Sequence, residues 1–363
     1  MEEQHEAPQR ASRKPKPMSM FFEAESSDDT APRTGGSPRR WPWMALVLAF
    51  AALVVVGSVV AAALYVVSID RAVNQNLQRR TQQLPAETPT AEGEEERPPK
   101  TAGKAVNYVL LGSDSRVKTD AGQGRSDVLM VMHLSGDRKS AYLISFPRDM
   151  YVPIPGHGKD KINAAFAFGG PPLTVRTVEG LVDTRMDHVA LIDFEGFINL
   201  THELGGVTVY NKHPSVSQGY EFPVGNVTLR GEQALAYVRE RKQLPHGDID
   251  RAERQRVVLQ AILAKGLANE TISDPLKFIS FVRGVSRYVT VDEQLNDSDL
   301  RKTAISQRLK PGDIQSLQAP ISGFGTSPNN QSIDIVDQEK LKALAKALRT
   351  DRMDAYVDRY PDG

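Results

Sequence analysis

The amino-acid sequence predicts an α/β fold with a central mixed β-sheet flanked by helices, preceded by a single transmembrane helix. Two observations predict this fold. Apolar runs of strand length alternate with segments of helical periodicity between about residues 105 and 350, which is typical of helices packed on a sheet. A separate apolar stretch at residues 44–67 contains no charge and is long enough to cross a bilayer as a helix.

Composition excludes several classes of function. The chain has 45 basic and 45 acidic residues, so it lacks the overall positive field that attracts nucleic acid, and we expect no nucleic-acid partner. It has no cysteine, which excludes disulfides, thiolate catalysis and cysteine-ligated zinc. The histidines show no paired ligand spacing, so a zinc site is not expected. Any anion site must therefore be local.

The N-terminal part predicts a membrane anchor. Trp41, Trp43 and Tyr65 suit the two interfaces of the predicted span. Arg39 and Arg40 precede it, which places the N-terminus in the cytoplasm and the rest of the chain outside the cell. We expect a disordered cytoplasmic tail at residues 1–43, a transmembrane helix acting as signal-anchor at 44–67, an extracellular stalk at 68–104, the folded domain at 105–350 and a C-terminal tail at 351–363.

Three predicted strands adjoin loops that carry aspartate or arginine. An apolar run at residues 106–111 ends at the loop 112–116, and the loop 124–127 leads into a second run at 128–134. A third run, at 139–146, ends at Pro147-Arg148-Asp149. In α/β domains, functional sites are built from loops at strand ends. Further elements are expected as helices at 161–168 (with a glycine stop at 169–170), 173–182, 194–204, 275–288, 298–309 and 338–348, and as strands at 187–193 and 207–210.

The stretch from Tyr237 to Arg256 combines many charges with the start of a helix. Asp250 followed by Glu253 fits a capping box, with Asp250 as the N-cap. Arg251 and Gln255 then share a face with the apolar residues that follow, so they point toward the core. Arginine is rarely buried without an anionic partner, which favours an anion site here; the alternative is a solvated helix start with ordinary ion pairs.

Together these stretches resemble the LytR-CpsA-Psr (LCP) family. The resemblance covers about residues 105–350, in order and at plausible spacings. The matching stretches are Asn107–Arg116, Arg125–Asp127, Ser145–Asp149, Lys161–Ala165, Gly205–Val207 and the arginine run that begins at Arg239.

The resemblance implies a Mg²⁺-dependent phosphotransferase in the cell membrane, with a pyrophosphatase side activity. Such enzymes move a glycopolymer of teichoic acid, arabinogalactan or capsule type from a polyprenyl-diphosphate carrier to peptidoglycan, forming a phosphodiester. Asp114 and Asp127 would hold the metal. The diphosphate would lie among Arg125, Arg148, Lys161, Arg239, Arg241, Arg251 and Gln255, and the polyprenyl tail in an apolar channel between sheet and helices.

The residues alone are consistent with this chemistry. Several arginines can neutralise a diphosphate, and Mg²⁺ takes carboxylate oxygens. Phosphoryl transfer depends mostly on positioning and charge stabilisation, with Arg148 in a catalytic role. The acceptor hydroxyl must lose a proton, for which Asp127 or Asp248 is the candidate base.

Other readings stay open. Asp149 can simply cap a turn, and Asp248 can be a turn residue. The chain could be a non-catalytic membrane receptor for lipid-linked diphosphates or wall polymers, which would need the arginines but not Asp127. A transcription attenuator is disfavoured because the sequence has no helix-turn-helix signal.

Overall fold

The computed structural model describes residues 54, 58, 64–87, 96–113, 126–306 and 308–361. Residues 59–363 form one compact unit, and residues 1–58 group separately. The expected cytoplasmic tail and most of the predicted transmembrane helix lie outside the described residues. Within them, no helix combines the length and the apolar character needed to span a bilayer.

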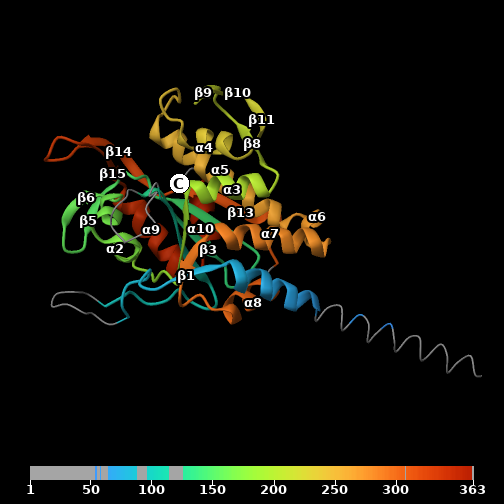
Figure 1. The fold of residues 1–363 in the computed structure, drawn as a ribbon. Helices are drawn as coiled ribbons and strands as arrows, with labels where there is room; N and C mark the ends of the chain where they lie inside the picture. Colours follow the sequence, from blue (N-terminus) through green and yellow to red (C-terminus); the bar gives the residue numbers. More distant parts are fainter. Residues whose placement is uncertain are drawn as a thin grey trace, which may run out of the picture. The chain divides into compact units, whose positions relative to one another are not determined.

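A mixed sheet runs through the domain with helices packed around it (Figure 1). It has seven strands, in the order β1-β12-β7-β2-β3-β4-β13. β3 is antiparallel to both of its neighbours, whereas β7 is parallel to β2 and β13 is parallel to β4. This confirms the predicted central mixed sheet. Its strands are β1 (Gln78–Arg80), β2 (Val106–Ser113), β3 (Ser126–Leu134), β4 (Ala141–Ser145), β7 (His188–Asp193), β12 (Thr290–Asp292) and β13 (Ile314–Gln318).

Short strands outside this sheet pair two by two. Most of them were not predicted, because they are too short for a clear alternation of apolar and polar residues. The pairs in the described part of the chain are β5 (Tyr151–Ile154) with β6 (Gly158–Lys161), β8 (Val207–Asn211) with β11 (Gly225–Leu229), β9 (Ser215–Ser217) with β10 (Tyr220–Phe222), and β14 (Ile321–Thr326) with β15 (Ser332–Val336).

Helices cover both faces of the sheet. Residues 64–76 are helical and lead into β1. The labelled helices are α2 (Ala164–Val182), α3 (Phe194–Glu203), α4 (Glu232–Arg239), α5 (Asp248–Leu267), α6 (Asn269–Ile272), α7 (Pro275–Tyr288), α8 (Asp297–Ser306), α9 (Gln338–Arg349) and α10 (Met353–Arg359), with a 3₁₀ turn η1 (Pro311–Asp313).

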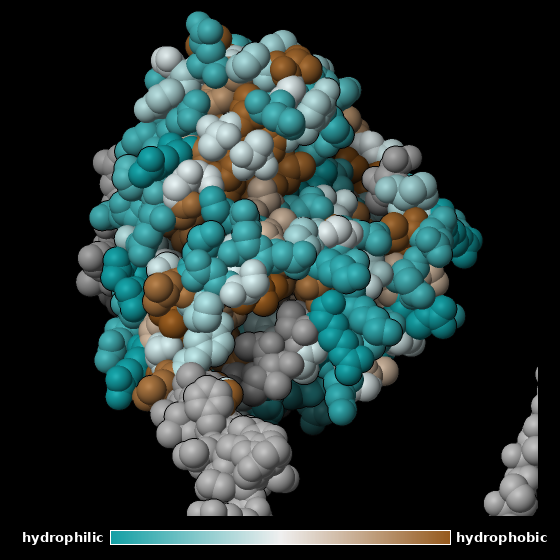
Figure 2. All heavy atoms as spheres, turned by 90° about the vertical axis from the view of Figure 1, so that its right-hand side faces the viewer, coloured by the Kyte–Doolittle hydropathy of each residue, from teal (hydrophilic) through white to brown (hydrophobic). Residues whose placement is uncertain are grey.

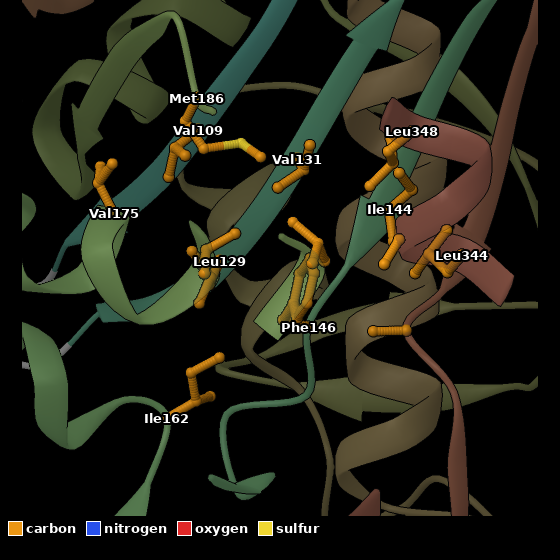
Figure 3. Packing of buried hydrophobic residues seen from close by; sticks show 14 of the residues in the cluster. Val109, Leu129, Val131, Ile144, Phe146, Ile162, Val175, Met186, Leu344 and Leu348 are labelled. Atoms are coloured by element: carbon orange, nitrogen blue, oxygen red, sulfur yellow. The ribbon is translucent and has the colours of Figure 1, made fainter. Parts of the chain in front are cut away.

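The main core lies on the face of the sheet covered by α2, α9 and α10. Figure 3 shows Val109 and Val131 of the sheet facing Val175 of α2 and Leu344 of α9. All four side chains have an exposed fraction of 0%. Alternate residues of the same strands point to the opposite face, as a pleated sheet requires.

The opposite face is packed less tightly. Leu259 and Leu263 of α5 lie against Leu143 of β4, and Leu110 and Met132 project from β2 and β3 beside them. Except for Leu143, these side chains are only half-buried. This face therefore keeps apolar surface that the protein itself does not fully cover.

The folded domain extends beyond the predicted boundaries of 105 and 350. In the segment expected to be a stalk, β1 pairs with β12, and the buried Arg97 forms an ion pair with Glu179 of α2 at 2.6 Å. In the segment expected to be a C-terminal tail, α10 places Met353 and Tyr356 in the main core. Neither segment is a simple linker.

Candidate active site

One edge of the central sheet gathers the loops that the sequence singled out. β3 runs antiparallel between β2 and β4, so the end of β2, the start of β3 and the end of β4 meet at this edge. The end of β7 lies there too, because Asp193 pairs with Ser113. The sequence-based prediction that strand-end loops build the site agrees with this topology.

A β-bulge marks the start of β3. Gly112 pairs with Val128 and Ser113 pairs with Ser126, so Asp127 is the extra residue. Bulges are common beside active sites, where they redirect a side chain. Asp114 and Arg125 lie outside the described residues, and the side chain of Asp127 is not described.

Three arginines from three segments surround the carboxylate of Asp248. Arg251 Nη2 lies 2.9 Å from Asp248 Oδ2, and Arg148 Nη2 lies 3.1 Å from Oδ1. Arg241 Nη1 is 3.7 Å from the same Oδ1. Arg148 follows β4, Arg241 follows α4, and Arg251 belongs to the first turn of α5. The structure thus brings together these four predicted site residues.

The start of α5 differs from the prediction and explains this geometry. The helix begins at Asp248 after Gly247, whose φ of 53° suits glycine. Asp250 is therefore not the N-cap, which was wrong, but lies in the first turn. Its carboxylate instead accepts a hydrogen bond from the backbone N–H of His246 at 2.8 Å. The earlier start puts Asp248 and Arg251 one turn apart on the same side.

Lys161 joins the cluster through Asp149. Lys161 Nζ lies 2.8 Å from Asp149 Oδ1, and Arg148 Nε lies 3.7 Å from Asp149 Oδ2. The prediction that Lys161 begins a helix was wrong, because it ends strand β6 and α2 starts at Ala164. Tyr151 of β5 pairs with Lys161, so the β5–β6 hairpin holds the lysine beside Asp149.

Arg239 is the last residue of α4, and Gln255 of α5 lies beside that end of the helix. The guanidinium of Arg239 stacks over the ring of Phe194 at 4.8 Å from its centroid, and Phe194 directly follows the last residue of β7. Gln255 donates a hydrogen bond to the carbonyl of Val238 at 3.3 Å. Arg239 is thus next to the same sheet edge, but among the described residues no ion pair links it to the Asp248 cluster.

Asp334 of β15 was not among the predicted site residues. Its backbone N–H donates to the carbonyl of Asp149 at 2.9 Å. Burial raises the pKa of its carboxyl group to about 6, and the negative charges of Asp149 and Asp248 act in the same direction. A signal was present in the sequence, since an acidic residue between Ile333 and Ile335 interrupts an apolar run.

This arrangement can bind an anion with several oxygens. Arginine supplies forked donors for phosphate and carboxylate oxygens, and the arginines here come from separate elements, so they can contact different oxygens of one ligand. A mixed sheet with arginines and a lysine gathered at one edge defines an α/β domain with a candidate anion site.

The LytR_cpsA_psr family model matches residues 65–350. The chain therefore belongs to the LytR_cpsA_psr family.

Its relatives include proteins named polyisoprenyl-teichoic acid–peptidoglycan teichoic acid transferase TagU. The protein of Enterococcus faecalis is 35% identical over 67% of this chain and 78% of its own length. That of Halalkalibacterium halodurans is 36% identical over 69% of this chain and 80% of its own length.

Solved structures share the fold. TagV of B. subtilis has a TM-score of 0.59 and 29% identity, covering 70% of this chain and 99% of that one. A structure of TagT bound to LIIa-WTA has a TM-score of 0.56 and 33% identity, covering 69% of this chain and 91% of that one.

Proposed function

We propose that this chain transfers a cell wall glycopolymer from a polyprenyl-diphosphate carrier to a hydroxyl group of peptidoglycan, forming a phosphodiester. The convergence of Arg148, Arg241 and Arg251 on one carboxylate carries the proposal. The names of the TagU relatives support a transferase with this kind of donor and acceptor. The polymer is of the teichoic acid, arabinogalactan or capsule type.

The arginines act by neutralising the diphosphate. Charge on phosphate oxygens repels an approaching hydroxyl oxygen, and fixed guanidinium groups offset it without reorganising during the reaction. Asp248 now holds these groups together, and a diphosphate would replace its contacts with more numerous ones. Lys161, Arg239 and Gln255 complete the ring around the headgroup in this proposal, together with Arg125.

Mg²⁺ is the proposed cofactor. The two proposed ligands, Asp114 and Asp127, each directly follow a residue of the Ser113–Ser126 pair in the sequence. Carboxylate oxygens are the ligands that Mg²⁺ prefers, and β-bulges such as the one at the start of β3 are common beside active sites. When bound, the ion would supply additional positive charge for the diphosphate oxygens.

The apolar face of the sheet supports a lipid-linked substrate. On α5, Arg256 precedes Leu259, Leu263 and Leu267 at helical spacing, so the charge stands at one end of an apolar stripe. Arg256 is buried and donates to Ser145 Oγ at 2.5 Å; its burial lowers its pKa to about 10. A charged end and an apolar body match a diphosphate headgroup with a hydrocarbon tail.

The surface near α6 and α7 also carries exposed apolar side chains. Leu276 at the start of α7 is 77% exposed, and Ile272 of α6 is 48% exposed. Figure 2 shows hydrophobic atoms gathered between hydrophilic regions on the side of the molecule that carries these helices in Figure 1. Such surface suits a domain that works beside a membrane.

Location follows from the same chemistry. In this proposal residues 44–67 anchor the chain in the cell membrane with its N-terminus in the cytoplasm, and the folded domain meets both the lipid carrier and peptidoglycan outside.

The Arg251→Ala variant tests the site. The full chain, purified in detergent with Mg²⁺, is incubated with a polyprenyl-diphosphate-linked glycan and peptidoglycan fragments, and the phosphodiester-linked product is measured by mass spectrometry. We expect about 10- to 100-fold less product, because a hydrogen bond to a charged group contributes about 1.5–3 kcal/mol. Arg287→Ala, at an arginine on α7 that pairs with Glu203, is the matched control.

Two outcomes contradict the proposal in different ways. If Arg251→Ala forms product as fast as the natural chain, the site is wrongly assigned. If the natural chain binds the lipid-linked glycan but forms no product, the chain is a receptor rather than a transferase.

A further inference from the structure

Asp334 is fixed against the turn that carries Arg148 and Asp149. It lies in β15 and forms an isolated β-bridge with Met150, and its N–H donates to the carbonyl of Asp149 at 2.9 Å. Only 8% of the residue is exposed. This bridge therefore fixes the backbone of Asp334 beside the residues that enter the site.

The charged groups acting on Asp334 all belong to the site. Lys161 and Arg148 attract its charge, while Asp149 and Asp248 repel it. The elements packed against β15 add little, since β14 has no charged residue and β5 has only the phenol of Tyr151. Asp334 is thus a third carboxylate of the arginine cluster, contributed by a distant part of the chain.

The carboxylates of Asp149, Asp248 and Asp334 differ in the number of cationic side chains that contact them. Asp248 is contacted by three guanidinium groups, and Asp149 is contacted by Lys161 and Arg148. Within the described residues, the carboxylate of Asp334 accepts no hydrogen bond and forms no ion pair. Of the three, it is the one whose oxygens have no hydrogen-bond or ion-pair partner in the described part of the chain.

We propose that Asp334 is the general base that activates the acceptor hydroxyl of peptidoglycan, an inference that rests on the proposed transferase function. The hydroxyl gives its proton to the Asp334 carboxylate while its oxygen forms a bond to the phosphorus that carries the glycan. The bond from that phosphorus to the bridging oxygen of the diphosphate breaks. Polyprenyl phosphate leaves with the electron pair, and the proton passes from Asp334 to solvent.

The protonation behaviour of the site agrees with this role. A general base works best when its pKa lies near the working pH. Burial, followed by the charges of Asp149 and Asp248, raises the pKa of Asp334 to about 6. At neutral pH the group is then mostly ionised, yet it holds a proton more readily than an ordinary exposed aspartate does.

The test compares Asp334→Asn with Asp337→Asn in the full chain in detergent. Asp337 stands three residues later and caps α9, and asparagine is an equally good N-cap, so it is a matched control. The transfer rate from a polyprenyl-diphosphate-linked glycan to peptidoglycan fragments is measured between pH 5 and 8, and binding of farnesyl diphosphate is measured separately.

For the natural chain and Asp337→Asn, we expect a rate that falls about tenfold per pH unit below about pH 6. Asp334→Asn should lose about 100-fold or more of the rate, and its remaining activity should lack that acid limb. Binding of farnesyl diphosphate should be unchanged, which separates loss of the base from loss of the site. A merely structural role would leave the acid limb in place.

Several results would overturn the inference. An Asp334→Asn variant with the natural rate, or with a low rate that keeps its acid limb, contradicts the role of base and leaves the transferase function standing. A natural chain that binds farnesyl diphosphate but transfers nothing overturns the transferase function itself, and the role of Asp334 with it.

Discussion

The raised pKa of Asp334 makes the stability of the protein depend on pH. Its folded-state pKa of about 6 lies above its ordinary value of 3.8, so the folded protein binds this proton more tightly than the unfolded chain does. The stability that this provides is fully present below about pH 4 and is lost as the pH rises through about 6.

We therefore expect Asp334→Asn, which stays neutral at every pH, to be more stable than the natural chain at pH 7.5 and about equally stable at pH 4. Thermal unfolding by circular dichroism at both pH values measures the difference, with Asp337→Asn as control. A variant whose Tm differs from that of the natural chain by the same amount at both pH values contradicts the raised pKa.

Some residues of the candidate site were predicted from the sequence, and Asp334 was not, for a physical reason. Arg148, Arg241, Arg251 and Asp248 belong to stretches with recognisable patterns, and their convergence agrees with that analysis. Asp334 reaches the site through a strand contact with residues far away in the sequence. Periodicity describes neighbours along the chain, so it cannot reveal such a contact.

Helix boundaries were predicted accurately where the residues at the helix end carry a recognisable capping or stop signal. α7 spans Pro275–Tyr288 as predicted, because Asp274 caps it with hydrogen bonds to the N–H groups of Leu276 and Lys277. Gly169 and Gly170 interrupt α2 where a glycine stop was expected. The start of α5 was misplaced because Gly247 adopts a positive φ, which the sequence pattern alone does not reveal.

The last helix, α10, offers a test of where the domain ends. Met353 and Tyr356 are 1% and 3% exposed and belong to the main core. Burying a large apolar side chain contributes about 1.5–3 kcal/mol, so a chain ending at Thr350 should lose about 3–6 kcal/mol of its free energy of unfolding. Urea unfolding of the two chains measures this loss.

A shorter truncation serves as the control, because it removes C-terminal residues and leaves α10 intact. A chain that ends at Tyr360 removes only the last three residues and should unfold at the same urea concentration as the natural chain. Equal stability of the chain ending at Thr350 would mean that residues 351–363 are a tail after all.

The two faces of the central sheet differ in how completely their apolar side chains are buried. The face under α2 and α9 is closely packed and holds the fold together, whereas the face under α5 retains half-buried leucines beside the buried Arg256. The proposed lipid site uses the face that contributes less to the core. The sequence predicts helices flanking the sheet, but hydrophobic periodicity is the same for a helix that covers a core and one that covers a ligand.

Membrane attachment is the prediction that belongs to the whole chain. We expect the full chain to sediment with the membrane fraction of cells that express it, and a chain lacking residues 1–63 to stay in the supernatant, because residues 44–67 are long and apolar enough to span a bilayer. In intact spheroplasts, protease should remove a C-terminal tag and spare an N-terminal one. A full chain recovered in the supernatant contradicts the anchor.

If residues 44–67 span the membrane as proposed, the pairing of β1 with β12 limits the distance between the active site and the bilayer. Between the end of the proposed span at residue 67 and the first sheet residue, Gln78, the chain is mostly helical, and nine helical residues extend only about 14 Å. Because this connection is short, the folded domain would lie close to the lipid headgroups. The domain could then bind the diphosphate of the lipid carrier while the polyprenyl tail stays in the bilayer. The peptidoglycan acceptor would have to reach the active site near the membrane surface.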